Sequence, residues 1–331
     1  MWNIVGQTRA VSLLQRSLEK GSLSHAYLFV GPAHVGKMTL ALNLAQALNC
    51  EASAKPCGEC ASCQRIAAGI HPDVQTIGLS PKGGSTESQT EISIDQIRQI
   101  QHSASLPPFE GRHRAFIIDG AEFLSIEAAN CLLKTLEEPA DKVIFLLLTA
   151  TSGLPSTVVS RCQRVELFPV PVAEIETALT GRVDIQPAKA ALLARISHGC
   201  PGWAISAAFN GILLQQRTDY LDELTDMIDA DGEERFGFAS RRVAQLGQNR
   251  RLIQERLDLW VDWWRDLLLV KTGAGETVSN IDRRDVLIDL AHRYSLHQIR
   301  DFIENLRIAG NQLRLNANPQ LVLEVLMLSL P

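Results

Sequence analysis

Short apolar runs alternate with stretches of helical periodicity through the first half of the chain. Helical spacing runs from Lys37 to about Asn49. A second helix is expected after a good N-cap at Ser93, and a third one stops at Pro139. Two of the intervening runs, 114–119 and 142–150, are continuously apolar, which is typical of strands in a parallel sheet covered on both faces. A loop rich in Gly and Ser is expected over 79–89. We therefore predict an α/β nucleotide-binding layer with strands at 26–30, 73–77, 114–119, 142–150 and 164–168.

The pattern changes near residue 169, and from there to residue 330 the spacing is helical only. One stripe of large apolar residues indicates helix packing rather than a platform for stacked bases: Ile253, Leu257, Trp260, Trp264 and Leu267. The last segment, 319–330, is apolar nearly all round, so we expect it to be buried within a helical bundle or against another chain. The sequence thus predicts an α/β part followed by an all-α part.

Composition narrows the class of protein. The chain has 331 residues, 46% of them hydrophobic and 21% charged, which is ordinary for a globular protein with two or three domains. Its net charge of -5 argues against strong nucleic-acid binding by this chain alone, although a DNA site shared with other subunits stays open. No apolar run reaches the roughly 18 residues of a membrane span, and the first residues do not resemble a signal peptide, so we expect a cytoplasmic location.

The stretch "LFVGPAHVGKMTL" fits a phosphate-binding loop between a strand and a helix. In the pattern G-x-x-x-x-G-K, backbone N–H groups cradle phosphates and the lysine reaches the terminal ones. Gly31, Gly36 and Lys37 supply that pattern here, followed by Met38 where a hydroxyl residue would hold magnesium. Thr39 cannot simply replace that hydroxyl, because neighbouring helix residues point about 100° apart.

The acidic residues that would position magnesium and activate water are also incomplete. The strand "AFIID" ends on Asp119, where such proteins keep the acid that orients magnesium through water. The next residue is Gly120 rather than the glutamate that activates water, and Glu122 lies two residues further, where we expect it to point differently. The candidate nucleotide-binding residues are therefore Gly31, Gly36, Lys37, Thr39 and Asp119, with binding of ATP and Mg²⁺ possible and hydrolysis weak or lacking.

Four cysteines lie within fourteen residues, at positions 50, 57, 60 and 63. Four thiolates close in sequence suit a tetrahedral zinc ion with no open coordination position, so the expected role is structural. An iron–sulfur cluster is the chemical alternative. Zinc is favoured because the segment is short, polar and contains glycine. The predicted metal ligands are Cys50, Cys57, Cys60 and Cys63.

Arg161 stands in the motif Ser160-Arg161-Cys162, just before the fifth predicted strand. This position is at the edge of the nucleotide domain and not over its own phosphates. An arginine there can act in trans, stabilising charge on the γ-phosphate bound by a neighbouring subunit. The alternative is an ordinary surface arginine.

Together these residues resemble the bacterial clamp-loader subunits of the AAA+ class. The segments that carry the resemblance are "SHAYLFVGP", "AANCLLKTLEEPA", "TSGLPSTVVSRCQ" and the cysteine knuckle, and the likeness is strong to about Phe168 and looser beyond. It implies a P-loop AAA+ domain over 1–168 with the knuckle at 50–63, a helical lid over 169–212, and a helical collar for oligomerisation over 213–331.

The same resemblance implies a role in DNA replication. The expected partners are the gamma/tau and delta subunits of DNA polymerase III in a ring of five, with the sliding clamp and primed DNA reached through that complex and no membrane involved. The gamma/tau motor keeps an intact Gly-Lys-Thr or Gly-Lys-Ser loop and Asp-Glu at the strand end, whereas this chain has Gly-Lys-Met and Asp-Gly. Trp203 stands about where the family's sensor arginine is expected.

Three alternatives stay open at this point. The chain could be a gamma/tau-like motor, a self-sufficient AAA+ ATPase acting on DNA, such as a helicase loader or branch migrator, or a zinc-bearing scaffold with no nucleotide. An intact hydrolytic site and a basic DNA-binding domain would favour the second. Measured ATP binding by the isolated chain separates the scaffold from the others.

Overall fold

The computed structural model describes residues 2–79, 91–151, 153–182, 185–246, 250–315 and 317–331. The chain divides into two compact units. The first is Met1–Ala178 with Gly199–Trp203, and the second is Leu179–His198 with Ala204–Pro331. The predicted loop over 79–89 falls, apart from Leu79, outside the described residues.

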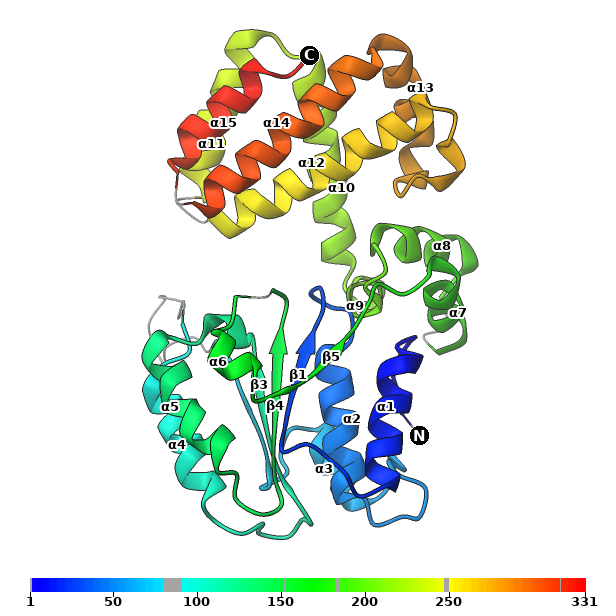
Figure 1. Cartoon of the computed structure of the whole chain (residues 1–331). Coiled ribbons are helices and arrows are strands. Elements are labelled where there is room, and N and C mark those ends of the chain that lie inside the picture. Colours follow the sequence, from blue (N-terminus) through cyan, green and yellow to red (C-terminus); the bar gives the residue numbers. More distant parts are fainter. Residues whose placement is uncertain (1, 80–90, 152, 183–184, 247–249, 316) are drawn as a thin grey trace. The chain divides into compact units, whose positions relative to one another are not determined.

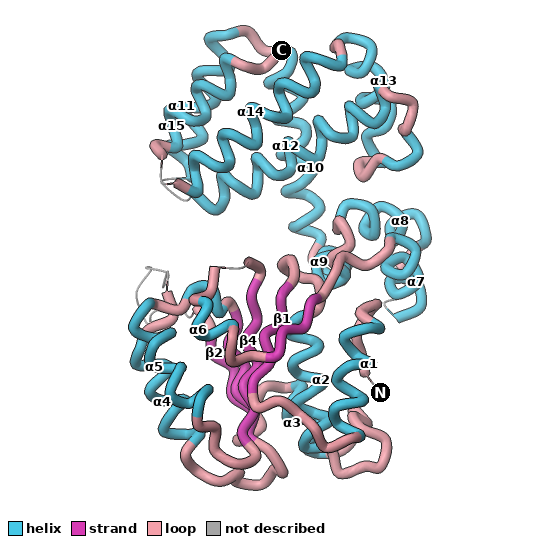
Figure 2. The backbone as a smooth tube through the Cα atoms, viewed as in Figure 1, coloured by secondary structure: helices cyan, strands magenta, loops and turns pink. Residues whose placement is uncertain are grey.

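A five-stranded parallel sheet forms the centre of the first unit (Figure 2). Its spatial order is β2-β3-β4-β1-β5, so β1 lies between β4 and β5, which follow it much later in the chain. In β4 every residue is buried, as expected for a central strand covered on both faces. The strands are β1 (Ala26–Val30), β2 (Val74–Ile77), β3 (Arg114–Asp119), β4 (Val143–Thr149) and β5 (Gln163–Glu166).

Alternate residues of the central strands contribute to two separate cores. Phe29, Ile117 and Leu146 pack on one face with Leu40 and Leu44, whereas the neighbouring residues of the same strands pack on the other face with Ile97 and Leu132. Figure 1 shows the resulting three layers, with α1 and α2 on one side of the sheet and α4 and α5 on the other. The helices of this unit include α1 (Thr8–Glu19), α2 (Lys37–Asn49), α3 (Ala61–Ala67), α4 (Ile94–Ala104), η1 (Ala121–Phe123), α5 (Ile126–Glu137) and α6 (Ser156–Val159).

Beyond the sheet the described chain is helical, as predicted. The tryptophan stripe of α12 is buried in one large core, which confirms that it serves helix packing. These elements are α7 (Val172–Arg182), α8 (Pro187–Ile196), α9 (Pro201–Phe209), α10 (Gly211–Asp229), α11 (Gly232–Leu246), α12 (Arg250–Lys271), η2 (Gly275–Thr277), η3 (Ile281–Arg283), α13 (Arg284–Arg293), α14 (Leu296–Arg314) and α15 (Pro319–Leu328).

Helix α15 is only half buried in this chain. Val322, Leu323 and Leu326 enter the core of the second unit. The opposite face exposes three large apolar side chains at helical spacing, Leu321, Val325 and Leu328, which are 60–68% exposed. One face of this segment is therefore buried, as expected. The opposite face is not covered by any described part of the chain.

The predicted α/β plus all-α class is confirmed, with small shifts at element ends. Asp73, expected to begin the second strand, lies just before β2, and the fifth strand ends at Glu166 rather than at Phe168. The division into three domains at residues 168 and 212 stays a prediction, because the compact units are cut differently. Among the helices that the structure describes, none is both long and apolar enough to cross a membrane.

Candidate functional site

The loop Gly31–Gly36 joins β1 to α2, as the sequence predicts for a phosphate-binding loop. Its geometry depends on glycine at both ends. A Cβ on Gly31 would lie 2.5 Å from the carbonyl oxygen of Leu167, and Gly36 has a φ of 110°, a left-handed conformation that other residues rarely adopt. The N-terminus of α2 therefore begins at a tight loop, the arrangement that binds anionic groups.

Lys37 closes over this loop. Its Nζ donates hydrogen bonds to the carbonyl oxygens of Gly31, at 2.6 Å, and Pro32, at 2.7 Å. Burial lowers the pKa of Lys37, while the nearby carboxylates of Glu122 and Asp119 act in the opposite direction. The lysine is thus held at the loop by neutral oxygens and two acids, ready to exchange them for a phosphate.

Two acidic side chains share the electrostatic environment of Lys37. Burial raises the pKa of Asp119, with Lys37 opposing and Glu122 reinforcing the shift. Glu122 Oε1 accepts a hydrogen bond from the backbone N–H of Ala150 at 3.0 Å, and its Oε2 is buried with no partner among the described residues. We expected Glu122 to point elsewhere, but the structure places its carboxylate close enough to influence both Lys37 and Asp119.

The reason is the turn after β3. Gly120 has a φ of 73°, and the short η1 helix that follows turns the chain back on itself. A Cβ on Gly120 would lie 2.8 Å from the ring of Phe123. Glycine followed at once by a helical turn was the sequence signal that could have revealed the position of Glu122.

Met38 and Thr39, the two residues after Lys37, stand in the first turn of α2. Met38 packs against the core between the sheet, α1 and α2. Thr39 uses its backbone carbonyl to accept a hydrogen bond from Asn43 in the next turn of α2. Gly31, Gly36, Lys37 and Asp119 are therefore gathered at the carboxyl end of the sheet as predicted, whereas the contribution of Thr39 stays a prediction.

A segment distant in sequence also reaches the loop. The N–H of Gly202 donates a hydrogen bond to the carbonyl oxygen of His34 at 2.9 Å. A Cβ at Gly202 would lie 2.8 Å from that oxygen, so only glycine permits the approach. Cys200 and Lys37 influence each other electrostatically. Trp203, the residue after Gly202, belongs to the short segment Gly199–Trp203, which is part of the first unit.

Arg161 lies in the turn between α6 and β5, away from this cluster. Its Nη1 donates to the carbonyl oxygen of Thr157 at 2.8 Å, and its Nη2 pairs with Glu137 Oε1 at 2.5 Å. One third of the side chain is exposed. Within the described residues no hydrogen bond or ion pair joins Arg161 to Lys37 or Asp119.

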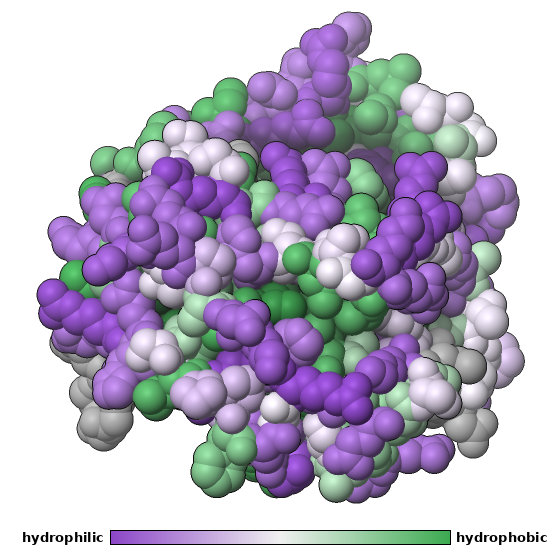
Figure 3. Space-filling view, turned by 60° about the horizontal axis from the view of Figure 1, so that its bottom comes forward, coloured by the Kyte–Doolittle hydropathy of each residue, from purple (hydrophilic) through white to green (hydrophobic). Residues whose placement is uncertain are grey.

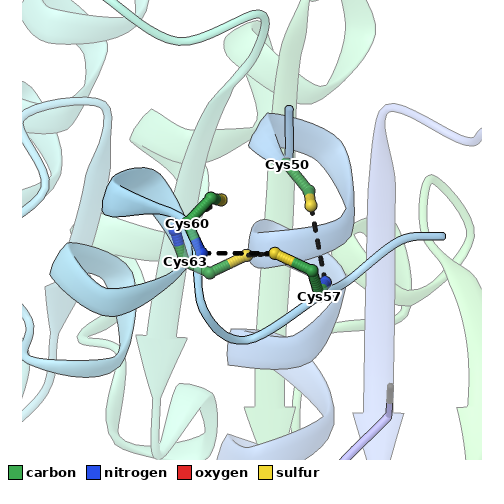
Figure 4. A group of neighbouring side chains, drawn as sticks. All are labelled: Cys50, Cys57, Cys60 and Cys63. Carbon is green, nitrogen blue, oxygen red and sulfur yellow. Dashed lines mark hydrogen bonds between the residues drawn. The ribbon is translucent and has the colours of Figure 1, made fainter. Parts of the chain in front are cut away.

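The four predicted metal ligands come together (Figure 4). Cys50 follows the last residue of α2, Cys57 lies in the connecting loop, Cys60 is the N-cap of α3, and Cys63 lies within α3. Their Sγ atoms all lie within 4.8 Å of one another. A cluster of four cysteine thiols at such distances can hold one metal ion.

The surroundings of the sulfur atoms fit a bound cation. Backbone N–H groups point at the sulfurs, including those of Cys57 to Cys50 at 3.4 Å and of Cys60 to Cys57 at 3.3 Å. Such bonds from Cys60 and Glu59 lower the pKa of Cys57 to about 6, whereas burial raises the pKa of Cys63 to about 12. Because metal ligands are thiolates, a cation here would offset the cost of ionising the buried Cys63.

A buried polar network beside the knuckle was missed by sequence reasoning. Asp73 accepts hydrogen bonds from the backbone N–H groups of Phe109, Glu110 and Gly111 at 2.7–2.9 Å and pairs with Arg114. His71 contacts Ser62 of α3 at 3.2 Å. This network fixes α3 to the loop before β3. The signal was "GIHPDV", a polar His and Asp directly before a strand.

Comparison with known proteins adds the following findings. The family described as DNA polymerase III, delta subunit, matches residues 6–171. The chain is 30% identical to the DNA polymerase III subunit delta' of Bacillus subtilis, over 98% of this chain and 96% of that protein. It is 27% identical to the subunit tau of the same organism, over 98% of this chain, but spans only 60% of tau's length.

A solved structure described as a DNA polymerase III gamma subunit-related protein from Thermotoga maritima is also similar. The TM-score is 0.48 at 19% identity, covering 96% of this chain and 97% of that one.

Proposed function

The chain belongs to the DNA polymerase III delta-subunit family, with the delta-prime type of clamp-loader subunit among its relatives, and from this premise we propose how it acts. It is a delta-prime-type subunit of a clamp loader, which assembles with gamma/tau and delta subunits and assists ATP-driven loading of the sliding clamp onto primed DNA. Its contribution to ATP chemistry is Arg161, given to the site of the adjacent subunit. The observation that carries this proposal is the position of Arg161, part-exposed and apart from Lys37.

The contacts of Arg161 support a role in trans. Nη1 is engaged by Thr157 and Ser160 and Nη2 by Glu137; within the described residues the guanidinium makes no further hydrogen bond, which leaves Nε and the second hydrogen of Nη2 for an incoming phosphate. Guanidinium groups stay charged and bind phosphate oxygens in pairs. An arginine held at one edge by its own chain needs little reorganisation to reach a neighbour's γ-phosphate.

The chain's own nucleotide site supports binding better than hydrolysis. The loop and Lys37 have the shape that holds phosphates. Met38 offers no oxygen ligand for magnesium, and Gly120 stands where a motor subunit has the glutamate that activates water. We propose that ATP with Mg²⁺ binds weakly and that the isolated chain turns it over slowly.

We propose that the ion in the cysteine cluster is zinc. A closed set of four thiolates satisfies tetrahedral zinc completely, which makes the ion a structural crosslink between the end of α2 and α3. When bound, zinc would hold the loop 51–59 in place, and this chain's backbone N–H groups would orient the sulfurs.

The exposed apolar face of α15 supports assembly with other subunits. Leu321, Val325 and Leu328 form a stripe along one side of the helix, and such stripes mark contact surfaces when they are exposed together. We propose that this face packs against a neighbouring chain in the collar.

The experiment that tests the proposal is reconstitution. The chain is expected to copurify with gamma/tau and delta subunits, and DNA-stimulated ATP hydrolysis by the complex should fall when this chain is left out. A complex that assembles and hydrolyses ATP equally well without it would contradict the proposal.

One observation favours a second candidate, a gamma/tau-like motor. Glu122 lies close to Lys37 and Asp119 and has a free carboxylate oxygen, so it is placed to act on water in place of the missing glutamate. This candidate predicts that the isolated chain hydrolyses ATP at about 1 per second or faster, and that Glu122→Gln abolishes the activity. Slow hydrolysis that Glu122→Gln leaves unchanged would favour the delta-prime assignment.

A further inference from the structure

A hollow of about 1120 Å³ opens in the first unit, at the end of the sheet opposite the phosphate-binding loop. It lies where β1, β3 and β4 begin, since its wall includes His25, His113 and Val143. Figure 3 looks onto this end of the molecule, where hydrophobic residues show between hydrophilic ones. None of the residues proposed above to act on a nucleotide lines this hollow.

The floor of the hollow is apolar, with a contribution from the cysteine knuckle. Trp2, Leu18, Leu48 and Ile144 provide most of the large apolar surface. Residues 53–56, which lie between Cys50 and Cys57, form one wall. A metal ion in the knuckle would therefore also fix the shape of this wall.

Cations dominate the rim. Lys55, Arg112 and Lys142 come from three separate segments, and Glu19 and Asp141 are the acids among the lining residues. In the part of the chain that the structure describes, none of the three cations forms an ion pair. Side chains of one sign that lack partners around an apolar floor attract a ligand of the opposite sign.

The wall also contains polar atoms that lack partners. Ten buried side-chain atoms of the described chain have no hydrogen bond, and three of them belong to lining residues: Trp2 Nε1, His25 Nε2 and His113 Nδ1. Trp2 is more than nine-tenths buried, so its N–H is shielded from water without a protein acceptor. A buried group of this kind costs free energy unless a partner satisfies it, so these three atoms leave the wall with unmet hydrogen-bonding capacity.

The dimensions and charges select among ligand classes. The volume exceeds the roughly 300–1,000 Å³ of small-molecule pockets. A single-stranded nucleic acid is disfavoured because its bases need an exposed aromatic ring to stack on, and Trp2 among the lining residues is too buried for that. A short peptide with a large apolar side chain and a neighbouring carboxylate fits both the floor and the rim.

We propose that this hollow is a docking site for a short acidic and apolar segment of a partner protein. The apolar side chain of the segment lies on the floor beside Trp2 and Leu48, and its carboxylates pair with Lys55, Arg112 and Lys142. The site is independent of the role assigned to Arg161, so either assignment can fail without the other.

The test uses two defined peptides and the full chain labelled with ¹⁵N. The indole N–H signal of Trp2 is assigned by its loss in Trp2→Phe. Titration with acetyl-Asp-Leu-Phe-Glu-amide is expected to shift this signal, with binding at least about fivefold tighter than that of the neutral acetyl-Asn-Leu-Phe-Gln-amide, a difference that ion pairs of this kind provide. Equal binding of the two peptides, or no shift at about 5 mM peptide, a concentration that would saturate most of a site with a Kd near 1 mM, would overturn the proposal.

Variants locate the binding. Arg112→Gln and Lys142→Gln should each weaken binding of the acidic peptide about three- to tenfold, since each removes one partner of a carboxylate. Arg9→Gln, an exposed arginine of α1 outside the hollow, is the matched control and should leave binding unchanged. The other indole signals report whether each variant is folded. An equal loss in Arg9→Gln, or a Trp2 shift produced by a single-stranded oligonucleotide instead of the peptide, would contradict the assignment.

Discussion

At the residue scale, the turn after β3 decides which acid can approach the nucleotide site. Gly120 adopts a left-handed conformation against Phe123, and η1 then brings Glu122 near Lys37 and Asp119. A glutamate at position 120, as in a motor subunit, would need a different turn. The backbone conformation at position 120, and not only the missing side chain, therefore distinguishes this site from one with a glutamate there.

The first prediction concerns this strain. Gly120→Ala should lower the free energy of unfolding by about 1–3 kcal/mol, because alanine must adopt a positive φ and its Cβ meets the ring of Phe123. Gly21→Ala is the matched control, since Gly21 has a similar φ of 64° and open space around its Cβ. It should cost about 1 kcal/mol. Denaturant unfolding of both variants checks the difference, and equal costs would show that Phe123 does not enforce the turn.

A second residue whose surroundings decide its state is Asp73, which lies just before β2. Although burial acts to raise the pKa of Asp73, hydrogen bonds from Phe109, Glu110 and Gly111 hold it below the usual range. A lowered pKa in the folded state contributes stability above the ordinary value of about 3.9, and that stability is lost as the pH falls through this value toward the lowered one. The carboxylate is thus a buried anchor that works only when ionised.

We therefore predict that Asp73→Asn lowers the free energy of unfolding by about 2–4 kcal/mol near pH 6, because the amide cannot satisfy three N–H donors and Arg114. The difference from the unaltered protein should shrink below about pH 4, because the unfolded chain then binds a proton at Asp73, whereas the folded chain, with its lowered pKa, binds it only at lower pH. Asp95→Asn, at an exposed carboxylate, is the control and should change little. A penalty that is the same at pH 3 and pH 6 would refute this role.

Individual residues also show which features the sequence alone could predict and which it could not. Gly31, Gly36, Lys37 and Asp119 could be found from spacing, because a loop that cradles phosphates demands those residue types in that order. Gly202 could not, since its need for glycine arises from a carbonyl 168 residues earlier in the chain, that of His34. Contacts between distant segments leave no local pattern.

At the scale of elements, apolar runs predicted the central strands, and the shorter mixed segments 73–77 and 164–168, also predicted as strands, form β2 and β5. The ends shifted where a side chain had another task, as with Asp73, whose carboxylate binds a neighbouring loop. The burial of α15 was harder to predict, because the sequence pattern of an apolar helix face is the same whether the single chain exposes that face or buries it. The cysteine knuckle was predictable because all four ligands lie within fourteen residues.

The knuckle yields the third prediction. Elemental analysis should find about one zinc per chain, as four cysteine thiolates require. Cys57→Ser should lose most of the metal, while the rest of the first unit stays folded, because α3 is also fixed through His71 and Ser62. Cys131→Ser, outside the cluster, should keep the metal. Iron in place of zinc, or less than half an equivalent of any metal in the reduced protein, would contradict the assignment.

At the scale of the whole molecule, two part-exposed features support the proposed role as a subunit of a complex. The α15 stripe offers an apolar contact, and Arg161 offers a charge that its own loop does not use. Under the proposed function, neighbouring subunits would cover the stripe and bring a bound nucleotide to the arginine.

The most direct measurement compares Arg161→Ala with Lys37→Ala in the reconstituted complex. Arg161→Ala should leave folding, metal content and assembly nearly unchanged, because its ion pair with Glu137 is exposed and worth little. DNA-stimulated ATP hydrolysis and clamp loading should fall, by less than the roughly 10³–10⁵ of the strongest arginine fingers, since a single interface is affected. Arg161→Lys should restore little, because an ammonium lacks the paired donors. If Lys37→Ala abolishes loading while Arg161→Ala leaves it unchanged, the chain acts through its own nucleotide site and the central claim is contradicted.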